Sequence, residues 1–150
     1  MASLVPMVEA DREEFMRMAA DHFAELDPSF VPRDDWREHY FSRILSDPRH
    51  SLRWIVSEGS KAGFILFGIE DHRFLPRKTG VIYELYVMPA MRRRGLAKES
   101  AQAAIAELRT LSPSKIQLEV MEGHPSAVSL WRSLGFHKVS ERFVLTGSGA

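Results

Sequence analysis

The feature that most constrains the fold is an apolar run at residues 81–88, which Pro89 ends and a long amphipathic pattern follows. Apolar side chains then recur at helical spacing over residues 94–111. A further β-rich run covers residues 116–121. A strand, a helix and a strand in this order predict a βαβ crossover. Such a crossover brings the start of the helix beside the carboxyl end of the first strand, where ligands tend to bind.

The remaining elements are predicted by the same patterns of periodicity and turn residues. In chain order we expect a helix over 11–25, a helix from Asp34 or Asp35 to before Pro48, strands over 52–57 and 62–69, the crossover, a helix over 125–134 and a last strand over 136–145. Helices around three antiparallel-looking strands and one parallel crossover predict an α+β fold. Its central sheet is mixed and mostly antiparallel, flanked by helices, in a single domain over 1–150.

Local signals support several of these boundaries. Asp11 and Glu14 have the spacing of a capping box at the start of the first helix. Residues 58–61 have the composition of a hairpin turn. Pro125 suits the first turn of a short helix, and Gly135 is suited to the left-handed residue that ends it. Residues 146–150 are expected to be a frayed end.

Composition excludes several classes of function. Twenty basic and 20 acidic residues give no net charge, which argues against a general nucleic-acid binder. The absence of cysteine excludes disulfides, thiolate metal sites and a cysteine nucleophile. The six histidines lack metal-ligand spacing with acidic neighbours, so we expect no metal. The start resembles no signal peptide and no apolar run approaches the roughly 20 residues of a membrane span, so a cytoplasmic protein without membrane contact is expected.

A basic turn lies at the predicted strand-to-helix junction. Its sequence over 92–97 is Arg-Arg-Arg-Gly-Leu-Ala. The start of a helix offers unpaired N–H groups and a partial positive charge, and Gly95 and Ala97 are small enough to let a phosphate approach the backbone. The turn is therefore either a phosphate site or a solvated basic turn before an ordinary helix.

This chain resembles the GNAT acetyltransferase superfamily in two motifs. The first is the strand sequence Tyr-Glu-Leu-Tyr-Val-Met-Pro over 83–89, followed by Arg92-x-x-Gly95-x-Ala97. The second is the helix over 127–136, which ends in Leu134-Gly135-Phe136. The resemblance covers roughly residues 50–145. The first 50 residues are where such proteins differ, and their helices usually shape the site of the acceptor.

The resemblance implies acetyl-CoA as co-substrate and a primary amine of a small molecule or peptide as acceptor. The backbone of the strand would pair with the pantetheine arm and polarise the thioester carbonyl. The turn would hold the pyrophosphate, with Lys98 close enough to assist and one or two arginines contacting phosphate. The implied cofactor-binding residues are Leu85, Tyr86, Val87, Arg92, Arg93, Arg94, Gly95, Leu96, Ala97, Lys98, His124 and Trp131.

Glu84 is the candidate general base, because an ammonium must lose a proton before it attacks and a carboxylate in a partly dry cleft can take it. It is the one acidic residue of the 81–88 run, and strand alternation predicts that it shares a face with Ile82 and Tyr86. A charge between apolar neighbours is costly unless it is partnered. The alternatives are a structural salt bridge or a role in orienting the acceptor.

Two positions depart from the family pattern. Trp131 stands where many members have a tyrosine that protonates the departing thiolate. Tyr86, Tyr83 or water would take that role, or the thiolate leaves unassisted, since thiols are fairly acidic. His124 replaces a frequent asparagine; it either hydrogen-bonds the pantetheine or is a simple loop residue.

Three hypotheses remain open at this point. The chain is an acetyltransferase, a non-catalytic acyl-CoA-binding or sensor module on the same fold, or a partner-binding subunit without cofactor affinity. Trp36 and Tyr40 either wall the acceptor pocket or pack in the core. The acceptor could be an antibiotic amine, a polyamine, an amino acid or a protein amine. A homodimer is one option, because dimers are common in proteins of this kind.

Overall fold

The computed structural model describes residues 1–147, so the last three residues of the expected frayed end lie outside the described part. The elements are β1 (Ser3–Pro6), η1 (Glu9–Asp11), α1 (Arg12–Leu26), α2 (Asp34–Ser46), β2 (His50–Ser57), β3 (Ser60–Asp71), β4 (Lys78–Val87), η2 (Pro89–Met91), α3 (Leu96–Arg109), β5 (Lys115–Gln117) and α4 (Pro125–Ser133). Within these residues no helix has the length and apolar character needed to cross a membrane.

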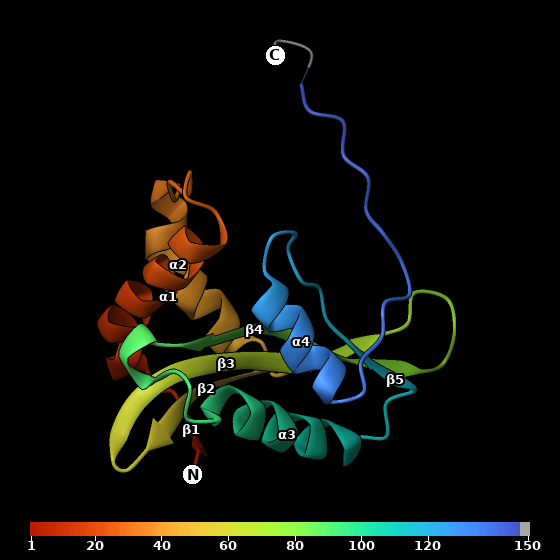
Figure 1. Cartoon of the computed structure of the whole chain (residues 1–150), viewed down its shortest axis with the longest axis horizontal. Coiled ribbons are helices and arrows are strands. Elements are labelled where there is room, and N and C mark those ends of the chain that lie inside the picture. Colours follow the sequence, from red (N-terminus) through yellow and green to blue (C-terminus); the bar gives the residue numbers. More distant parts are fainter. Residues whose placement is uncertain (148–150) are drawn as a thin grey trace.

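The strands form one sheet in the order β1-β2-β3-β4-β5, with only the β4–β5 pair parallel. Helix α3 connects these two parallel strands (Figure 1). The predicted βαβ crossover and the mixed, mostly antiparallel α+β sheet are therefore confirmed. A two-residue turn, Glu58-Gly59, joins β2 to β3 as the hairpin signature predicts.

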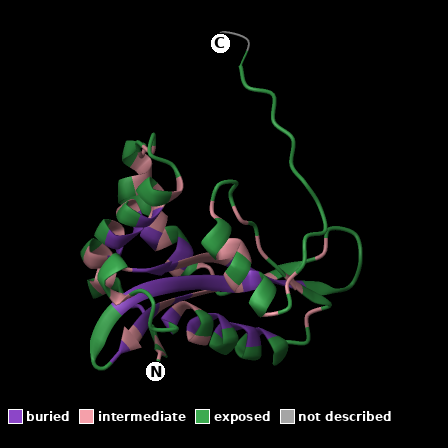
Figure 2. Cartoon of the chain, viewed as in Figure 1, coloured by how far each residue is buried: buried purple, intermediate pink, exposed green. Residues whose placement is uncertain are grey.

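A layer of helices covers each face of the sheet. Helices α1 and α2 lie on one face and α3 on the other (Figure 1). Each face has its own apolar cluster, and the central strands are the most continuously buried part of the chain (Figure 2). Phe15, Phe41 and Trp54 belong to the cluster under α1 and α2, whereas Ile65 and Leu108 belong to the cluster under α3. The burial of both faces of the sheet fixes the position of β4 between the two layers of helices.

A β-bulge in β4 changes which side chains share a face. Leu66 of β3 pairs with Glu84, but the next residue of β3, Phe67, pairs with Ile82, so Tyr83 is the extra residue. Ile82 consequently packs in the cluster under α3, whereas Tyr83 packs on the α1 side. The prediction that Glu84 shares a face with Ile82 is therefore wrong, because simple alternation does not hold across a bulge. The prediction that it shares a face with Tyr86 is confirmed, since its carboxylate contacts α1 and Tyr86 packs there too.

Three other sequence predictions differ from the structure. Strand β1 was not predicted; it pairs with β2 along the edge of the sheet. The strand expected over 116–121 is short, since β5 pairs only with Thr79, Gly80 and Val81. No strand forms over 136–145, where Phe143 and Leu145 are exposed. A single extended segment needs a neighbouring strand to satisfy its backbone groups, and none pairs with it in the described chain.

The expected capping box is also wrong. The Asp11 carboxylate accepts a hydrogen bond from the N–H of Val8 at 2.8 Å and makes no side-chain cap of α1. Glu14 pairs instead with Lys61 at the turn end of β3. The 3-10 turn η1 therefore supplies the entry into α1, and it shifts these two carboxylates away from capping geometry.

Candidate active site

Strand β4 has a free edge over its second half. β5 pairs with β4 only as far as Val81, and no described strand pairs with that edge beyond it. The N–H of Met88 donates to Ala62 O of β3 at 2.7 Å. Because successive residues of a strand direct their backbone groups to opposite edges, the N–H groups of Leu85 and Val87 face the free edge. These amides can receive an extended ligand as an added strand would.

The turn between η2 and α3 lies just beyond this edge. Arg93 and Gly95 have φ values of 64° and 76°, and α3 begins at Leu96. The first α-helical bond of the segment runs from the N–H of Glu99 to Gly95 O at 3.0 Å. In the described chain, no protein acceptor is found for the N–H groups of residues 93–98. The turn is therefore a set of unpaired donors at the positive end of a helix, which suits a phosphate.

The three arginines of this turn have different environments. The Arg92 guanidinium donates to Val87 O at 2.7 Å and pairs with Glu25 of α1 at 2.6 Å. The hydrogen bond to Glu25 raises the pKa of Arg92, so the charge is held in place. Arg93 and Arg94 are exposed. Arg92 thus fastens α1 to the end of β4, and the other two side chains remain available to an anionic ligand.

Glu84 is paired with a histidine that the sequence did not single out. Nε2 of His22 lies 2.6 Å from Oε2 of Glu84. The His22 side chain is 8% exposed and that of Glu84 is 23% exposed. The carboxylate is therefore partnered, as its cost in a central strand demands, while it still reaches solvent.

Aromatic rings enclose the His22–Glu84 pair. The ring of His22 lies 5.6 Å from Phe64 at 90° and 5.3 Å from Tyr86, centroid to centroid. Tyr40 of α2 faces the pair: burial, and then the Glu84 carboxylate, raise the pKa of its phenol. Tyr40 also stacks on Trp36 at 5.2 Å. These two residues were expected either to wall the acceptor pocket or to pack in the core. Both are partly buried and pack against the cluster under α1 and α2, and Tyr40 also lies close to Glu84.

The two tyrosines of β4 differ in what their hydroxyl groups contact. The Tyr83 hydroxyl donates to Glu70 at 2.5 Å, and burial together with this hydrogen bond raises the pKa of Tyr83. Burial also raises the pKa of Tyr86, and Glu25 and Asp21 add to the effect. Tyr86 lines a shallow groove of about 360 Å³ with Asp21, Ala24, Glu25 and Pro89. Tyr86 is therefore the tyrosine that lines this groove, although its side chain is largely buried.

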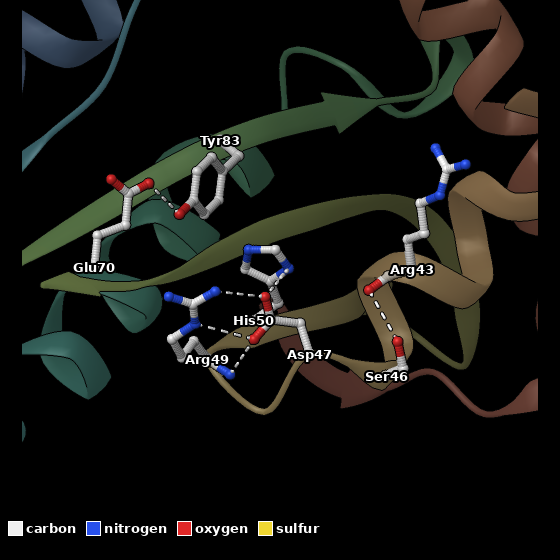
Figure 3. A network of polar contacts seen from close by, with 7 residues as sticks. All are labelled: Arg43, Ser46, Asp47, Arg49, His50, Glu70 and Tyr83. Carbon is white, nitrogen blue, oxygen red and sulfur yellow. Dashed lines mark hydrogen bonds and ion pairs between the residues drawn. The ribbon is translucent and has the colours of Figure 1, made fainter.

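A second polar network lies at the start of β2, where Asp47 accepts hydrogen bonds from the backbone and side chain of Arg49 (Figure 3). The bonds from Arg49 lower the pKa of Asp47. His50 lies 3.8 Å from the same carboxylate, and its ring meets Tyr83 edge-on at 5.2 Å. This network anchors the turn between α2 and β2, and its His50 ring contacts the side chain of Tyr83, whose hydroxyl is bound to Glu70.

Helix α4 ends in a Schellman motif built on the second sequence signature. Gly135 has a φ of 96°, its N–H donates to Arg132 O, and the N–H of Phe136 donates to Trp131 O. The rings of Trp131 and Phe136 meet edge-on at 5.5 Å. The predicted helix stop at Gly135 is confirmed. Trp131 is buried in the cluster that also contacts Leu85, so it supports β4 from the face opposite Glu84.

His124 lies at the N-cap of α4 and is partly buried, without a side-chain capping bond. Lys98 is exposed in the first turn of α3. No cluster of three metal-ligating side chains occurs in residues 1–147. The predicted residues of β4 and those of the turn lie near one another, because the turn follows the carboxyl end of β4 with only η2 between them.

His22 is the site residue that the sequence analysis missed. The sequence feature that could have identified it is its position in the buried stripe of α1, three residues after Ala19 and four after Met18. A titratable side chain in an apolar stripe needs a partner. The sequence alone does not reveal which element supplies that partner.

Comparisons with known proteins agree with this geometry. A sequence model of the acetyltransferase (GNAT) family matches residues 12–136, and the chain belongs to this family. It is 28% identical over 130 residues to the N-alpha-acetyltransferase RimI of Mycobacterium tuberculosis, covering 84% of this chain and 77% of that protein.

Solved structures support the fold. A transcriptional regulator from Bacillus halodurans superposes with a TM-score of 0.81 at 17% identity, covering 98% of this chain and 100% of that chain. A ribosomal-protein-alanine N-acetyltransferase from Brucella melitensis gives a TM-score of 0.74 at 17% identity with the same coverages. The GNAT-like α+β fold expected from the motifs is therefore confirmed.

Proposed function

We propose that this protein is an N-acetyltransferase that moves the acetyl group of acetyl-CoA to a primary amine by direct attack. The observation that carries the proposal is the free edge of β4 lying next to the unpaired amides of residues 93–98. An extended arm with a pyrophosphate at one end fits such a surface. The whole chain would act as one GNAT domain.

The residues present fit acetyl-CoA in donor type and in charge. The N–H groups of Leu85 and Val87 would pair with the pantetheine arm and donate to the thioester carbonyl oxygen. The amides from Arg93 to Lys98 would hold the pyrophosphate, with the side chains of Arg93 and Arg94 adding charge. Arg92 would act through the fold instead, because Glu25 and Val87 O already engage its guanidinium. When bound, acetyl-CoA supplies an activated acyl group and a good leaving thiolate.

Glu84 would be the general base. Its carboxylate is held at Oε2 by His22 and is partly open to solvent, so the other oxygen can take a proton from an arriving ammonium, directly or through a water. Tyr86 would be the proton donor in place of the tyrosine that Trp131 replaces. Its raised pKa keeps the phenol protonated, and it borders the groove, whereas the Tyr83 hydroxyl is bound to Glu70.

The α-amine of a peptide is the first acceptor to test, because the relative from Mycobacterium tuberculosis is named an N-alpha-acetyltransferase. Small-molecule amines form the second group. Of the two carboxylates in the groove beside Tyr86, that of Glu25 is paired with Arg92, so the negative charge of Asp21 is the one that favours an acceptor arriving as a cation.

The deciding experiment is incubation with acetyl-CoA, a panel of peptide and small-molecule amines, and a thiol reagent that reports free CoA. Thiol release that requires one of the amines supports the proposal. The panel is paired with thermal unfolding in the presence of acetyl-CoA. A binder gains about 2.7 kcal/mol when the ligand is present at a hundredfold excess over its Kd.

The two readouts separate the competing functions. Stabilisation by acetyl-CoA without thiol release for any amine would identify a non-catalytic acyl-CoA sensor, the alternative that the tryptophan at position 131 leaves open. No stabilisation at all would leave a partner-binding subunit and contradict both cofactor-dependent functions.

The Glu84→Gln variant tests the base. It keeps the size of the side chain but removes the proton acceptor, so we expect kcat to fall roughly 10²-fold or more, the usual contribution of a positioned base. The Kd for acetyl-CoA should stay within about twofold of the parent value, because the groups that would bind it are backbone amides of other residues. An unchanged kcat would rule out Glu84 as the base.

A further inference from the structure

His22 and Glu84 come from elements far apart in the chain and meet in a single short contact. They are 62 positions apart, one on α1 and one on β4, and their Nε2 and Oε2 atoms lie 2.6 Å apart. Of the two side chains the histidine is the more buried, at 8% exposure against 23%. The carboxylate is therefore the member of the pair that faces outward.

The ring of His22 has little freedom to turn. Phe23 lies 5.0 Å from it at 49°, Phe64 lies 5.6 Å away at 90°, and Tyr86 lies 5.3 Å away at 56°. Rings packed from three directions in a dense interior keep one rotamer. The imidazole is thus held in one orientation, whereas the glutamate has three rotatable bonds and no other hydrogen-bond partner in the described chain.

We propose that His22 is a positioning residue for the acetyl-transfer reaction. It donates from Nε2–H to Oε2 of Glu84 and leaves Oε1 as the oxygen that receives the proton of the amine. This role rests on the proposed function. Such a bond holds a catalytic oxygen in one place before the acceptor arrives, which lowers the entropic cost of reaching the reactive geometry.

The proton transfer is balanced at Glu84. The ammonium of the acceptor gives one proton to Oε1, which turns the carboxylate into a carboxylic acid and the ammonium into a neutral amine. The nitrogen lone pair then forms the C–N bond, the C–S bond breaks, and the sulfur keeps its electron pair. The sulfur takes a proton from the Tyr86 hydroxyl, the nitrogen of the new amide gives its second proton to the Tyr86 oxygen, and Glu84 returns its own proton to solvent. His22 keeps its hydrogen bond to Oε2 throughout and neither gains nor loses a proton.

The test compares two replacements of the same length. Glutamine retains an N–H donor near the position of Nε2, whereas methionine has a similar shape and no donor. Both lose the ring contacts equally, so the difference between His22→Gln and His22→Met reports the hydrogen bond. A matched control is His39→Met, which changes a half-exposed histidine on α2.

We expect kcat of His22→Met to fall roughly tenfold or more relative to His22→Gln, which corresponds to about 1.4 kcal/mol of transition-state free energy. The KM for acetyl-CoA should remain within about twofold in both variants, and kcat of His39→Met should match that of the parent. Equal kcat values for His22→Gln and His22→Met would overturn the proposal and leave His22 as a core residue.

A double-mutant cycle distinguishes a positioning role of His22 from a purely structural one. In the Glu84→Gln background, His22→Met should cause no further loss of kcat, because the positioned carboxylate is already absent. A full additional loss would overturn the proposal. A parent that binds acetyl-CoA yet acetylates no amine would overturn the proposed function itself. An active parent with equal Gln and Met variants would overturn only the role of His22.

Discussion

Replacement of Gly63 by alanine should separate β3 from β4 at the candidate site. Gly63 pairs with Val87 across the two strands. A Cβ added at Gly63 would lie 1.8 Å from Tyr86 O, 2.8 Å from Tyr86 C and 2.9 Å from Val87 Cα. All three are backbone atoms, so no side-chain rotation can relieve the contact. The strands must therefore move apart by more than about 1 Å to reach ordinary contact distances.

The loss of unfolding free energy follows from the packing and the hydrogen bonds that this movement disrupts. Overpacking of a dense interior costs about 1–3 kcal/mol. The neighbouring hydrogen bond from Met88 N–H to Ala62 O, now 2.7 Å, would be stretched along with the next bond of the ladder, and each lost bond costs about 1 kcal/mol. Together these effects give about 4 kcal/mol, or roughly 8–16 °C in Tm for a chain of this size.

Urea denaturation and thermal unfolding of Gly63→Ala measure this effect. The control is Gly59→Ala in the same hairpin, where no atom lies within 4 Å of an added Cβ and only the backbone strain of about 1 kcal/mol is expected. A Gly63→Ala variant within about 1 kcal/mol of the parent, the low end of the cost of overpacking, would refute the close approach of the two strands. Any folded variant should also bind acetyl-CoA more weakly, because Tyr86 and Val87 would be displaced.

Two further predictions concern the two sequence motifs. Gly135→Ala should lower the free energy of unfolding, measured by urea denaturation, by about 1–2 kcal/mol, because the φ of Gly135 is 96°. Gly135→Asn should lower it by less, since asparagine tolerates this conformation. Equal losses for the two variants would contradict the conformational explanation. The double variant Arg93→Ala, Arg94→Ala should raise the Kd for acetyl-CoA roughly tenfold at low salt in calorimetry, and less at high salt, because charge pairs are screened. Arg109→Ala, at the other end of α3, should leave the Kd unchanged; an equal effect there would indicate nonspecific attraction.

Much of the fold was predictable because its signals are local. The hairpin at Glu58-Gly59, the helix stop at Gly135 and the crossover from β4 through α3 to β5 each follow from dihedral preferences or periodicity within one stretch of chain. The turn of residues 92–97 was recognisable for the same reason. Glycine between a strand and a helix marks a backbone conformation that other residues rarely adopt, and Gly95 has a φ of 76°.

The strand expected over 136–145 shows the limit of such signals. Its apolar residues have the composition of a strand, yet Val139, Phe143 and Leu145 are exposed and the backbone has no partner strand in the described chain. Strand formation depends on a neighbouring edge, and composition does not say whether an edge is available.

The candidate site, like the fold, could be predicted from the sequence only in part. The sequence by itself determined that a carboxylate, Glu84, lies in an apolar strand next to a basic turn that contains glycine. Only the tertiary structure decided the direction of that carboxylate, because the bulge at Tyr83 puts Ile82 and Glu84 on opposite faces. Only the packing of α1 against β4 decided that His22 is its partner. Local dihedral preferences act within a few residues, whereas a contact across 62 positions exists only when the burial of both faces of the sheet brings the two elements together.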